Sequence, residues 1–339
     1  MSSSTHEAPG TAPAAPAPPA PGAGGPDGAG TGGAGTGGRA ARGLSPSRAA
    51  DFLRCPLLYR FRTVDRLEEA PSPAAVRGTL VHAVLEHLFD LPAAGRTAEA
   101  ACGMVEEQWA RLREREARVG ALFADDDAGA REQERWLDSA RALLRRYFEL
   151  EDPARLEPAE REVLVELPLA DGPVLRGVVD RVDVAPSGDL RVVDYKTGRA
   201  PSASAEAAAL FQLRFYALVL WRLRGVVPRQ LQLVYLGSGH VLRHAPDEDE
   251  LRATERKVRA LWAAIERNRA SGEWPARPGR LCSWCDHKAL CPAFGGTPGA
   301  PAPARGGGGG GRAPAAPPPR VRRSHQPAGL DQRPAQHVL

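Results

Sequence analysis

The first half of the chain repeats apolar residues at helical spacing. Between Val76 and Phe89, apolar pairs recur about every four residues, which places them on one face of a helix. Ser45-Pro46-Ser47 has the form of a helix start, because serine caps a helix and proline is tolerated in its first turn. The pattern therefore predicts a helical first half, with helices at 48–62, 76–89, 98–118 and 128–150.

The period of the pattern changes after residue 160. Alternation of apolar and polar residues replaces helical spacing, and Pro186 to Asp189 has the composition of a turn. The alternation predicts strands at 162–169, 174–184, 190–196, 230–236 and 241–244, and helical spacing returns at 205–224 and 247–270. We therefore expect an α/β protein in which a helical lobe precedes a small sheet flanked by helices.

Both ends of the chain lack apolar residues. Residues 1–43 are mostly Ala, Pro, Gly, Ser and Thr, and residues 295–339 are mostly Pro, Gly, Ala and Arg. Such segments cannot bury enough surface to offset the entropy of ordering, so both are predicted to be disordered tails. One folded domain is predicted at 44–294, with a helical part at 44–150 and a part at 160–294 that holds the sheet and a cysteine-rich end.

The net charge of +4 is concentrated in the C-terminal tail. That tail carries six arginines against one aspartate, a balance of +5, and the N-terminal tail is neutral, which leaves −1 for the folded part. Such a tail either adds sequence-independent affinity for phosphates or reflects only an arginine-rich composition. No long apolar segment and no signal peptide are present, so we expect a cytoplasmic protein without membrane spans.

Two neighbouring strands each carry a carboxylate on their apolar face. Asp194 and Lys196 alternate onto the same face as the apolar residues of their strand, and Asp180 shares a face with three valines. A turn centred on Ser187 would bring Asp180 directly opposite Asp194, with Cβ atoms roughly 5 Å apart. A two-residue turn would instead make the two aspartates diagonal neighbours.

Two carboxylates this close repel each other and lose hydration, so they need compensation. A shared proton, a basic partner or a divalent cation would serve, and a buried Asp194–Lys196 pair beside a hydrogen-bonded aspartate is the alternative to a cation. Only three of the 45 basic residues are lysine, and lysine's compact head can sit beside a water and change its pKa. Four other charged residues fall on solvent-facing sides of the strands and receive no role: Arg181, Asp183, Glu162 and Glu166.

The motifs around these residues resemble a known nuclease family. GVVDRVD and LRVVDYKTG hold the aspartates and the lysine, RGTLVHAVLE holds His82, and FQLRFYAL holds Gln212 and Tyr216. In chain order, the histidine helix comes first, the strand hairpin second and the helix with Gln212 and Tyr216 third. This ordered set, over residues 45–294, resembles the RecB-like branch of the PD-(D/E)XK nuclease superfamily. Val179 stands where the superfamily's name has a proline, which that branch often lacks. The resemblance implies a restriction-endonuclease-like core, a small mixed sheet flanked by helices.

The resemblance also implies a role for each motif residue. Lys196 would orient or deprotonate the attacking water, since phosphodiester hydrolysis needs an activated water and a cation where negative charge builds up. Glu86, one turn after His82, would support that histidine. The ligands of Mg²⁺ or Mn²⁺ would be His82, Asp180, Asp194 and the backbone carbonyl of Tyr195.

Gln212 and Tyr216 lie four residues apart, so they share one helix face. The resemblance implies that both side chains line the site and contact DNA. The alternative is that they only pack the helix against the sheet.

Three cysteines near the end of the predicted domain have the spacing of a metal site. Cys282, Cys285 and Cys291 form C-x2-C-x5-C. Together with Cys55 they resemble the iron–sulfur clasp of AddB-type nucleases and of RecB-like nucleases of CRISPR adaptation, which implies a [4Fe–4S] cluster on these four residues. The alternative is a structural Zn²⁺ with His287 as a ligand. The fifth cysteine lies in a helical stretch and is predicted to be a small buried side chain.

The sequence thus predicts a metal-dependent DNA nuclease, a RecB-family exonuclease acting on single strands or DNA ends in repair or recombination. The alternatives are a non-catalytic DNA-binding or scaffold module with a structural metal cluster, a zinc-stabilised regulatory protein, and a CRISPR-adaptation nuclease. The complete set of acid, lysine and histidine positions favours catalysis. The sequence has no G-x-x-x-x-G-K-[ST] motif, so helicase activity would have to come from a separate partner.

Overall fold

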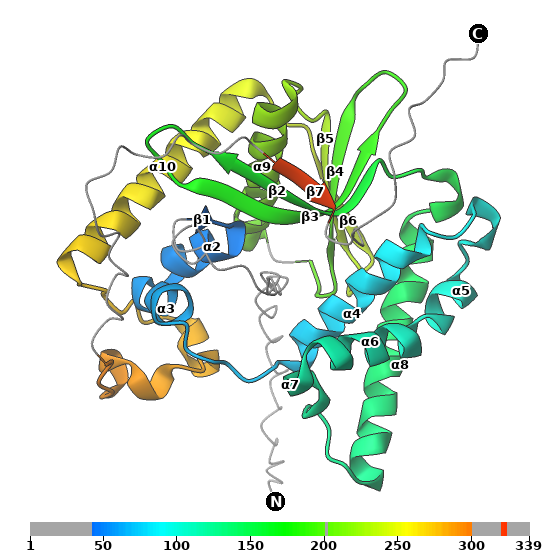
Figure 1. The fold of residues 1–339 in the computed structure, drawn as a ribbon, viewed down its shortest axis with the longest axis horizontal. Helices are drawn as coiled ribbons and strands as arrows, with labels where there is room; N and C mark the ends of the chain where they lie inside the picture. Colours follow the sequence, from blue (N-terminus) through cyan, green and yellow to red (C-terminus); the bar gives the residue numbers. More distant parts are fainter. Residues whose placement is uncertain (1–42, 201–202, 300–319, 324–339) are drawn as a thin grey trace, which may run out of the picture.

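The computed structural model describes residues 43–200, 203–299 and 320–323, and a mixed sheet lies at its centre (Figure 1). The strand order is β6-β5-β4-β3-β2-β7, with β1 beside β3. β4 pairs parallel with β5 and β1 parallel with β3, whereas the other neighbours are antiparallel. The expected small mixed sheet is therefore confirmed. The strands are β1 (Gly43–Leu44), β2 (Glu160–Pro168), β3 (Val174–Val184), β4 (Leu190–Lys196), β5 (Gln230–Tyr235), β6 (His240–His244) and β7 (Arg320–Arg323).

Helices cover both faces of this sheet, as the sequence predicted (Figure 1). None of those in the described residues combines the length and apolar character that a bilayer crossing requires. The α-helices are α2 (Pro46–Arg54), α3 (Pro56–Tyr59), α4 (Pro73–Leu88), α5 (Ala98–Gly103), α6 (Val105–Arg115), α7 (Ala117–Gly120), α8 (Asp127–Leu150), α9 (Ala203–Arg224) and α10 (Glu248–Ser271). Shorter turns of other helix types are η1 (Arg60–Asp65), η2 (Ala93–Gly95), η3 (Pro153–Arg155), η4 (Arg280–Trp284), η5 (Lys288–Leu290) and η6 (Pro292–Phe294).

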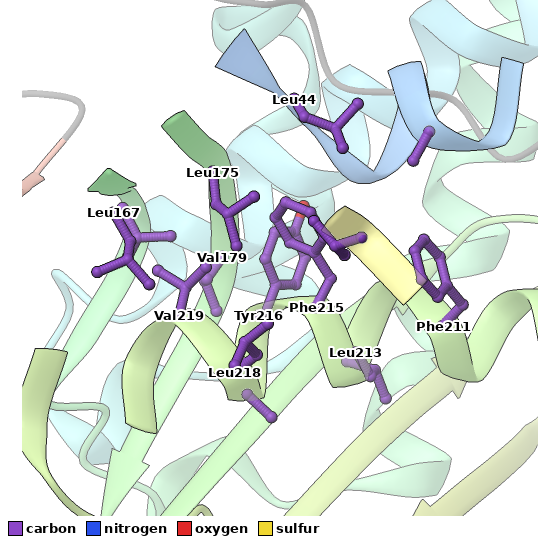
Figure 2. Packing of buried hydrophobic residues seen from close by; sticks show 14 of the residues in the cluster. Leu44, Leu167, Leu175, Val179, Phe211, Leu213, Phe215, Tyr216, Leu218 and Val219 are labelled. Carbon is purple, nitrogen blue, oxygen red and sulfur yellow. The ribbon is translucent and has the colours of Figure 1, made fainter. Parts of the chain in front are cut away.

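One hydrophobic core lies between the sheet and α9. Helix α9 connects the parallel strands β4 and β5, and its middle, from Phe211 to Trp221, is buried almost all round because α2 and α10 cover its outer side. Figure 2 shows Phe215, Tyr216 and Val219 of α9 beside Leu175 and Val179 of β3. This packing fixes α9 on the sheet next to β4.

A second hydrophobic core lies on the opposite face of the sheet. There α4, α5, α6 and α8 form a helical lobe, and four residues at the sheet contribute to its core. These residues are Val193, Tyr195 and Val234 of the strands and Leu236, which directly follows β5. β4 and β5 are therefore covered on both faces, and most of their residues are buried.

Two predicted helices are interrupted. The helix expected at 48–62 breaks at Cys55, which is extended because a residue before proline is disfavoured in the α conformation. A six-residue π-helical turn, η1, follows α3. The helix expected at 98–118 is divided into α5, α6 and α7, and its first break comes directly after Gly103, a residue that weakens helices.

Strand β7 lies inside the C-terminal tail that was predicted to be disordered. It pairs antiparallel with β2, from Val163↔Arg323 to Glu166↔Arg320. For these four residues the prediction of disorder is wrong. Composition alone cannot reveal that a sheet edge is available, and the free N–H and C=O groups of such an edge can pair with any extended segment.

Candidate active site

β3 and β4 stop pairing partway along their length. Their ladder ends at Arg181↔Val193, and its register centres the turn on Ser187, which is one of the two registers expected. Beyond this pair β3 continues beside β2, and β4 continues beside β5. The two strands therefore part where Asp180 and Asp194 would come opposite each other.

At Asp180, β3 changes the side on which it buries residues. Val179 packs in the core with α9, whereas Arg181 is buried on the opposite side, beside Tyr147 and Tyr195. Regular alternation would place Val179 and Arg181 on one face, so the strand twists sharply between them. The Asp180 carboxylate accepts the backbone N–H of Tyr195 at 2.7 Å and so bridges the gap where the ladder ends.

Glu162 of β2 lies opposite Asp180, because its two neighbours pair with the two neighbours of Asp180. Its φ is 43°. Non-glycine residues rarely adopt this left-handed conformation, which costs about 1–3 kcal/mol and tends to persist at functional sites. Sequence alternation placed Glu162 on a solvent-facing side, and the structure instead brings it to the site. Asp171-Gly172, a turn signal midway between Glu162 and Asp180, could have revealed this pairing.

His82 of α4 lies against both acids. Its Nδ1 is 3.5 Å from an Asp180 oxygen and 3.6 Å from a Glu162 oxygen, and its Nε2 is 3.0 Å from the carbonyl oxygen of Tyr195. Within the described residues, His82, Glu162 and Asp180 form the one group whose potential ligand atoms all lie within 4.8 Å of one another. Imidazole nitrogen, carboxylate oxygens and a carbonyl oxygen suit Mg²⁺ or Mn²⁺, so the donor set fits a divalent cation.

Asp194 stands outside that group and is paired with Lys196. The Lys196 Nζ lies 2.7 Å from Asp194 Oδ2. Gln212 of α9 joins them, because it donates to Asp194 Oδ1 at 2.8 Å and accepts from Lys196 at 2.9 Å. Tyr216 lies one turn further along α9, with its hydroxyl 3.5 Å from the Gln212 amide nitrogen. The structure thus connects Gln212 and Tyr216 of α9 to Asp194 and Lys196 of β4 through hydrogen bonds.

Gly177 makes room for Tyr216. A Cβ at position 177 would come within 2.7 Å of the Tyr216 ring, closer than such carbons approach in folded proteins. Tyr216 therefore lies directly over the backbone of β3, and α9 is held at the distance that lets Gln212 reach β4. This close approach explains why the GVVDRVD motif begins with a glycine.

Burial and mutual repulsion perturb the titration of these groups. Burial lowers the pKa of His82, but the charges of Asp180 and Glu162 outweigh it and raise the value to about 9. Burial raises the pKa of Asp180 to about 7, an effect that His82 opposes and Asp194 reinforces. Glu86, expected to support His82, lines a small cavity with it, and burial and the charge of Glu162 raise the pKa of Glu86. The cation-free site therefore retains protons near neutral pH.

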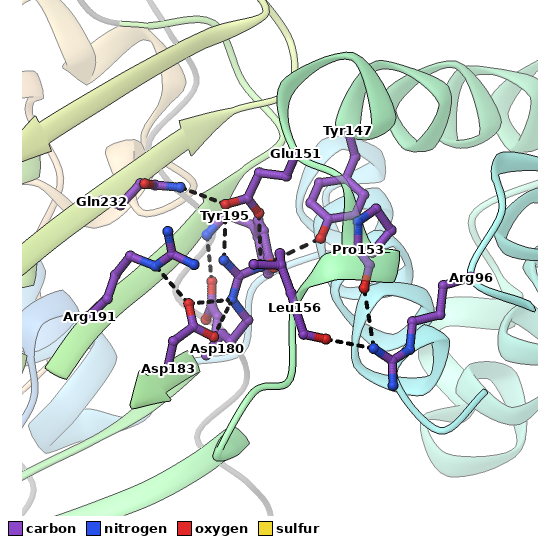
Figure 3. A network of polar contacts seen from close by, with 11 residues as sticks. Arg96, Tyr147, Glu151, Pro153, Leu156, Asp180, Asp183, Arg191, Tyr195 and Gln232 are labelled. Carbon is purple, nitrogen blue, oxygen red and sulfur yellow. Dashed lines mark hydrogen bonds and ion pairs between the residues drawn. The ribbon is translucent and has the colours of Figure 1, made fainter. Parts of the chain in front are cut away.

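Arg181 lies behind the site and is 1% exposed. Its guanidinium binds Glu151 at the end of α8 through two hydrogen bonds, at 2.8 and 3.0 Å, and lies 3.1 Å from Asp183. Figure 3 labels these two carboxylates together with Tyr147 and Tyr195. The guanidinium also donates to the hydroxyl of Tyr195, whose peptide contacts both Asp180 and His82. Arg181 therefore holds the side chain of the residue whose backbone belongs to the site.

The expectation that Arg181 and Asp183 face solvent is wrong for Arg181, which pairs with Asp183 in the interior. The pair exists, but the helical lobe covers it, and alternation along one strand cannot show that a distant helix buries its second face. Burial alone would raise the pKa of Glu151, yet its hydrogen bonds to Arg181 lower it, so this carboxylate stays ionised. Removing either Arg181 or Glu151 would leave the other as a buried charge without a partner, which typically costs about 3–5 kcal/mol of stability.

The cysteine-rich end lies against the first helices. The backbone N–H of Arg277 donates to Cys55 Sγ at 3.4 Å, and that of Gly279 donates to Cys282 Sγ at 3.3 Å. Burial raises the pKa of Cys285, and neighbouring Cys282 and Cys55 raise it further. In the described residues, no three cysteine sulfurs come within 4.8 Å of one another.

His287 and Cys102 have partners away from these sulfurs. The His287 Nε2 lies 2.8 Å from a Glu69 oxygen, and its ring packs edge-on against Phe61. Cys102 lies in the helical lobe, with its sulfur 3.8 Å from the carbonyl oxygen of Arg141. Neither residue is therefore arranged to complete a ligand set with Cys55.

Comparison with known proteins matches the chain to one family. A family model described as the PD-(D/E)XK nuclease superfamily matches residues 43–292. The Gene 69 protein of Mycobacterium phage D29 is 26% identical over 274 residues, which cover 74% of this chain and 96% of that protein. The Gene 69 protein of Mycobacterium phage L5 is 24% identical over 292 residues, with the same coverage of 74% and 96%. A proposed exonuclease from Eubacterium rectale, a solved structure, is similar with a TM-score of 0.47 and 14% identity over 73% of this chain and 88% of that one.

The raised pKa values predict how pH acts on the cation-free protein. Folding raises the pKa of Asp180 from 3.8 to about 7 and that of His82 from 6.5 to about 9. The folded state therefore binds more protons than the unfolded state, and this site makes stability fall as pH rises between about 4 and 9. At pH about 8 without metal, Asp180→Asn should unfold at a higher temperature than the natural chain. This difference in unfolding temperature should become smaller toward pH about 5.

Thermal unfolding at several pH values, with a chelator or with Mn²⁺, tests this prediction. Asp125→Asn, which changes an exposed aspartate of a loop, is the control and should follow the natural chain at each pH. Mn²⁺ should stabilise the natural chain and not Asp180→Asn. If the unfolding temperatures of Asp180→Asn and the natural chain differed by the same amount at every pH, the result would contradict the repulsion described above.

The two tyrosines beside Arg181 allow a matched test of its role. Tyr195→Phe and Tyr147→Phe each remove one buried hydroxyl next to the guanidinium, and each should cost about 1–3 kcal/mol of stability. Only Tyr195 carries a peptide that contacts His82 and Asp180. Calorimetric titration should therefore show weaker Mn²⁺ binding for Tyr195→Phe alone. Equal Mn²⁺ affinity in both variants would mean that Arg181 serves stability only.

Proposed function

The chain belongs to the PD-(D/E)XK nuclease superfamily, and on that premise we propose that it is a Mg²⁺- or Mn²⁺-dependent deoxyribonuclease. Within the superfamily we assign it to the RecB-like branch, as an exonuclease that acts on single strands or DNA ends in repair or recombination. The observation that carries this proposal is the pair of adjoining groups where β3 and β4 part. One is the acid–imidazole group of His82, Glu162 and Asp180, and the other is Asp194 with Lys196.

In this proposal the first group holds the cation. His82, Asp180 and the Tyr195 carbonyl were expected as ligands, and Glu162 joins them through its position opposite Asp180. Asp194, the remaining expected ligand, borders the group and raises the pKa of Asp180, so an incoming cation would also relieve its repulsion. The cation would supply positive charge where negative charge develops on the phosphate.

Lys196 is proposed to orient the attacking water and to offset negative charge on the phosphate as an ammonium, or to accept the water's proton as a neutral amine. Its ammonium is held by Asp194 and Gln212 rather than by solvent, so its position is defined before substrate arrives. Gln212 is proposed to steer this lysine in addition to any contact with DNA. A non-catalytic DNA-binding module would have no need to keep a half-buried lysine in this arrangement, which is why catalysis is the favoured function.

An iron–sulfur clasp is the second part of the proposal. The N–H groups of Arg277 and Gly279 donate to Cys55 and Cys282, and hydrogen bonds to sulfur are usual around such clusters. We propose a [4Fe–4S] cluster on Cys55, Cys282, Cys285 and Cys291. It would close a ring of about 230 residues and remove much of the entropy of the unfolded chain. The contact of His287 with Glu69 favours this cluster over a zinc site that uses His287.

Cleavage assays test the nuclease assignment. We expect protein purified without oxygen to degrade end-labelled single- or double-stranded DNA with Mg²⁺ or Mn²⁺ and not with a chelator. Lys196→Ala should lose a factor of about 10² or more in rate, as is typical when a residue that handles the water's proton is removed. Lys257→Ala, an exposed lysine of α10, is the control and should retain activity. Equal rates for the two variants would contradict the role of Lys196, and DNA binding without cleavage would favour the binding-module alternative.

Metal analysis tests the clasp. The anaerobically purified chain should contain about four irons and as many sulfides and show the broad visible absorption of a cluster. Cys55→Ser and Cys285→Ser should lose the absorption and lower the unfolding temperature, whereas Cys102→Ser should keep both. One zinc per chain and no sulfide would establish the structural zinc alternative instead.

A further inference from the structure

Strand β2 lies between the core strand β3 and a strand from the far C-terminal tail. That second neighbour is β7, the part of residues 300–339 that the structure describes, and it is separated from β2 by about 150 residues of chain (Figure 1). The family match ends at residue 292, so β7 lies outside the region that defines the superfamily. Without β7, the backbone of β2 would be an open sheet edge.

The register brings the end of β7 to the rim of the candidate active site. Arg323 pairs with Val163, and the residue before Val163 is Glu162 of the acid–imidazole group. Paired strands are about 4.8 Å apart, so the β7 backbone passes within one strand spacing of the strand that carries this acid. Arg322 and Arg320 follow at the next register positions, opposite Leu164 and Glu166.

The charge of this segment suits a polyanion. β7 reads Arg-Val-Arg-Arg, and it belongs to the tail that holds +5 of charge while the folded part holds −1. Pairing through the main chain holds such a strand in place without requiring its side chains. Three arginines on a strand of fixed position would act as a local phosphate-binding element, in contrast to the diffuse attraction of an unattached basic tail.

We propose that Arg320–Arg323 is a substrate arm, a strand docked on β2 whose arginines bind DNA phosphates beside the active site. The proposal rests on the proposed nuclease function. It assigns the arm a share of the binding of DNA, and none of the bond cleavage. The arm should therefore lower the KM for DNA and leave kcat nearly unchanged.

A comparison of two triple variants tests the docking as well as the charge. Arg320→Gln/Arg322→Gln/Arg323→Gln removes the arm's charge, and Arg305→Gln/Arg312→Gln/Arg333→Gln removes the same charge from elsewhere in the tail. Each is combined with Asp194→Asn to prevent cleavage, and binding to a fluorescent single-stranded oligonucleotide is followed by anisotropy at several salt concentrations. The arm variant should bind more weakly and reduce the salt slope by about 2, since each phosphate contact on single strands contributes about 0.7.

A strand-breaking variant separates backbone pairing from charge. Val321→Pro/Arg322→Pro removes two successive N–H groups, which point to opposite sides of a strand, so one of them faces β2 whatever the register. It should bind DNA more weakly than Arg322→Gln, which loses the same charge. Circular dichroism and the unfolding temperature confirm that each variant remains folded.

The outcomes distinguish this proposal from the function on which it rests. Equal weakening by the two triple variants, or equal binding by Val321→Pro/Arg322→Pro and Arg322→Gln, would overturn the docked arm while leaving the nuclease intact. Faster cleavage after loss of the arm's arginines in the otherwise natural chain would also overturn it, because the strand would then cover the site. Failure of the natural chain to cleave any DNA would instead count against the proposed function.

Discussion

The candidate site depends on the point at which β3 and β4 stop pairing. In a strand, the N–H and C=O of one residue point the same way, so both groups of Tyr195 face the gap that opens there. Buried backbone groups need partners, and here side chains supply them. Asp180 accepts the N–H and His82 contacts the carbonyl oxygen. The break in the ladder thus brings an acid, an imidazole and a carbonyl oxygen to one place before any cation arrives.

The site draws on both faces of the sheet. Lys196 and Gln212 are positioned from the side of α9, where Gly177 allows Tyr216 to lie close against β3. His82 reaches the gap from the helical lobe on the other side. The two hydrophobic cores therefore serve one purpose, since each fixes a helix whose polar residues meet at β4.

Much of this arrangement could be predicted from the sequence, because the strands and the order of motifs follow from local patterns. Asp180, Asp194 and Lys196 stood out as charges on apolar faces, and the turn register was one of two expected. Alternation along the strands did not reveal Glu162 or Arg181, and only the turn signal at Asp171-Gly172 points to the position of Glu162 opposite Asp180. A left-handed backbone conformation interrupts the alternation at Glu162, and the helical lobe, distant in sequence, buries Arg181. Both depend on tertiary structure that periodicity along a single strand does not contain.

The contact between His82 and Tyr195 joins residues 113 positions apart, one in the helical lobe and one in the sheet. The site is therefore complete only when the lobe is seated on β4, and a cation held by both parts would bind that seated state in preference to any other. By linkage, such a cation would shift the equilibrium between a lobe in place and a lobe lifted from the sheet. The concentration of the cation would then determine how often the lobe opens, as well as how often a cation occupies the site.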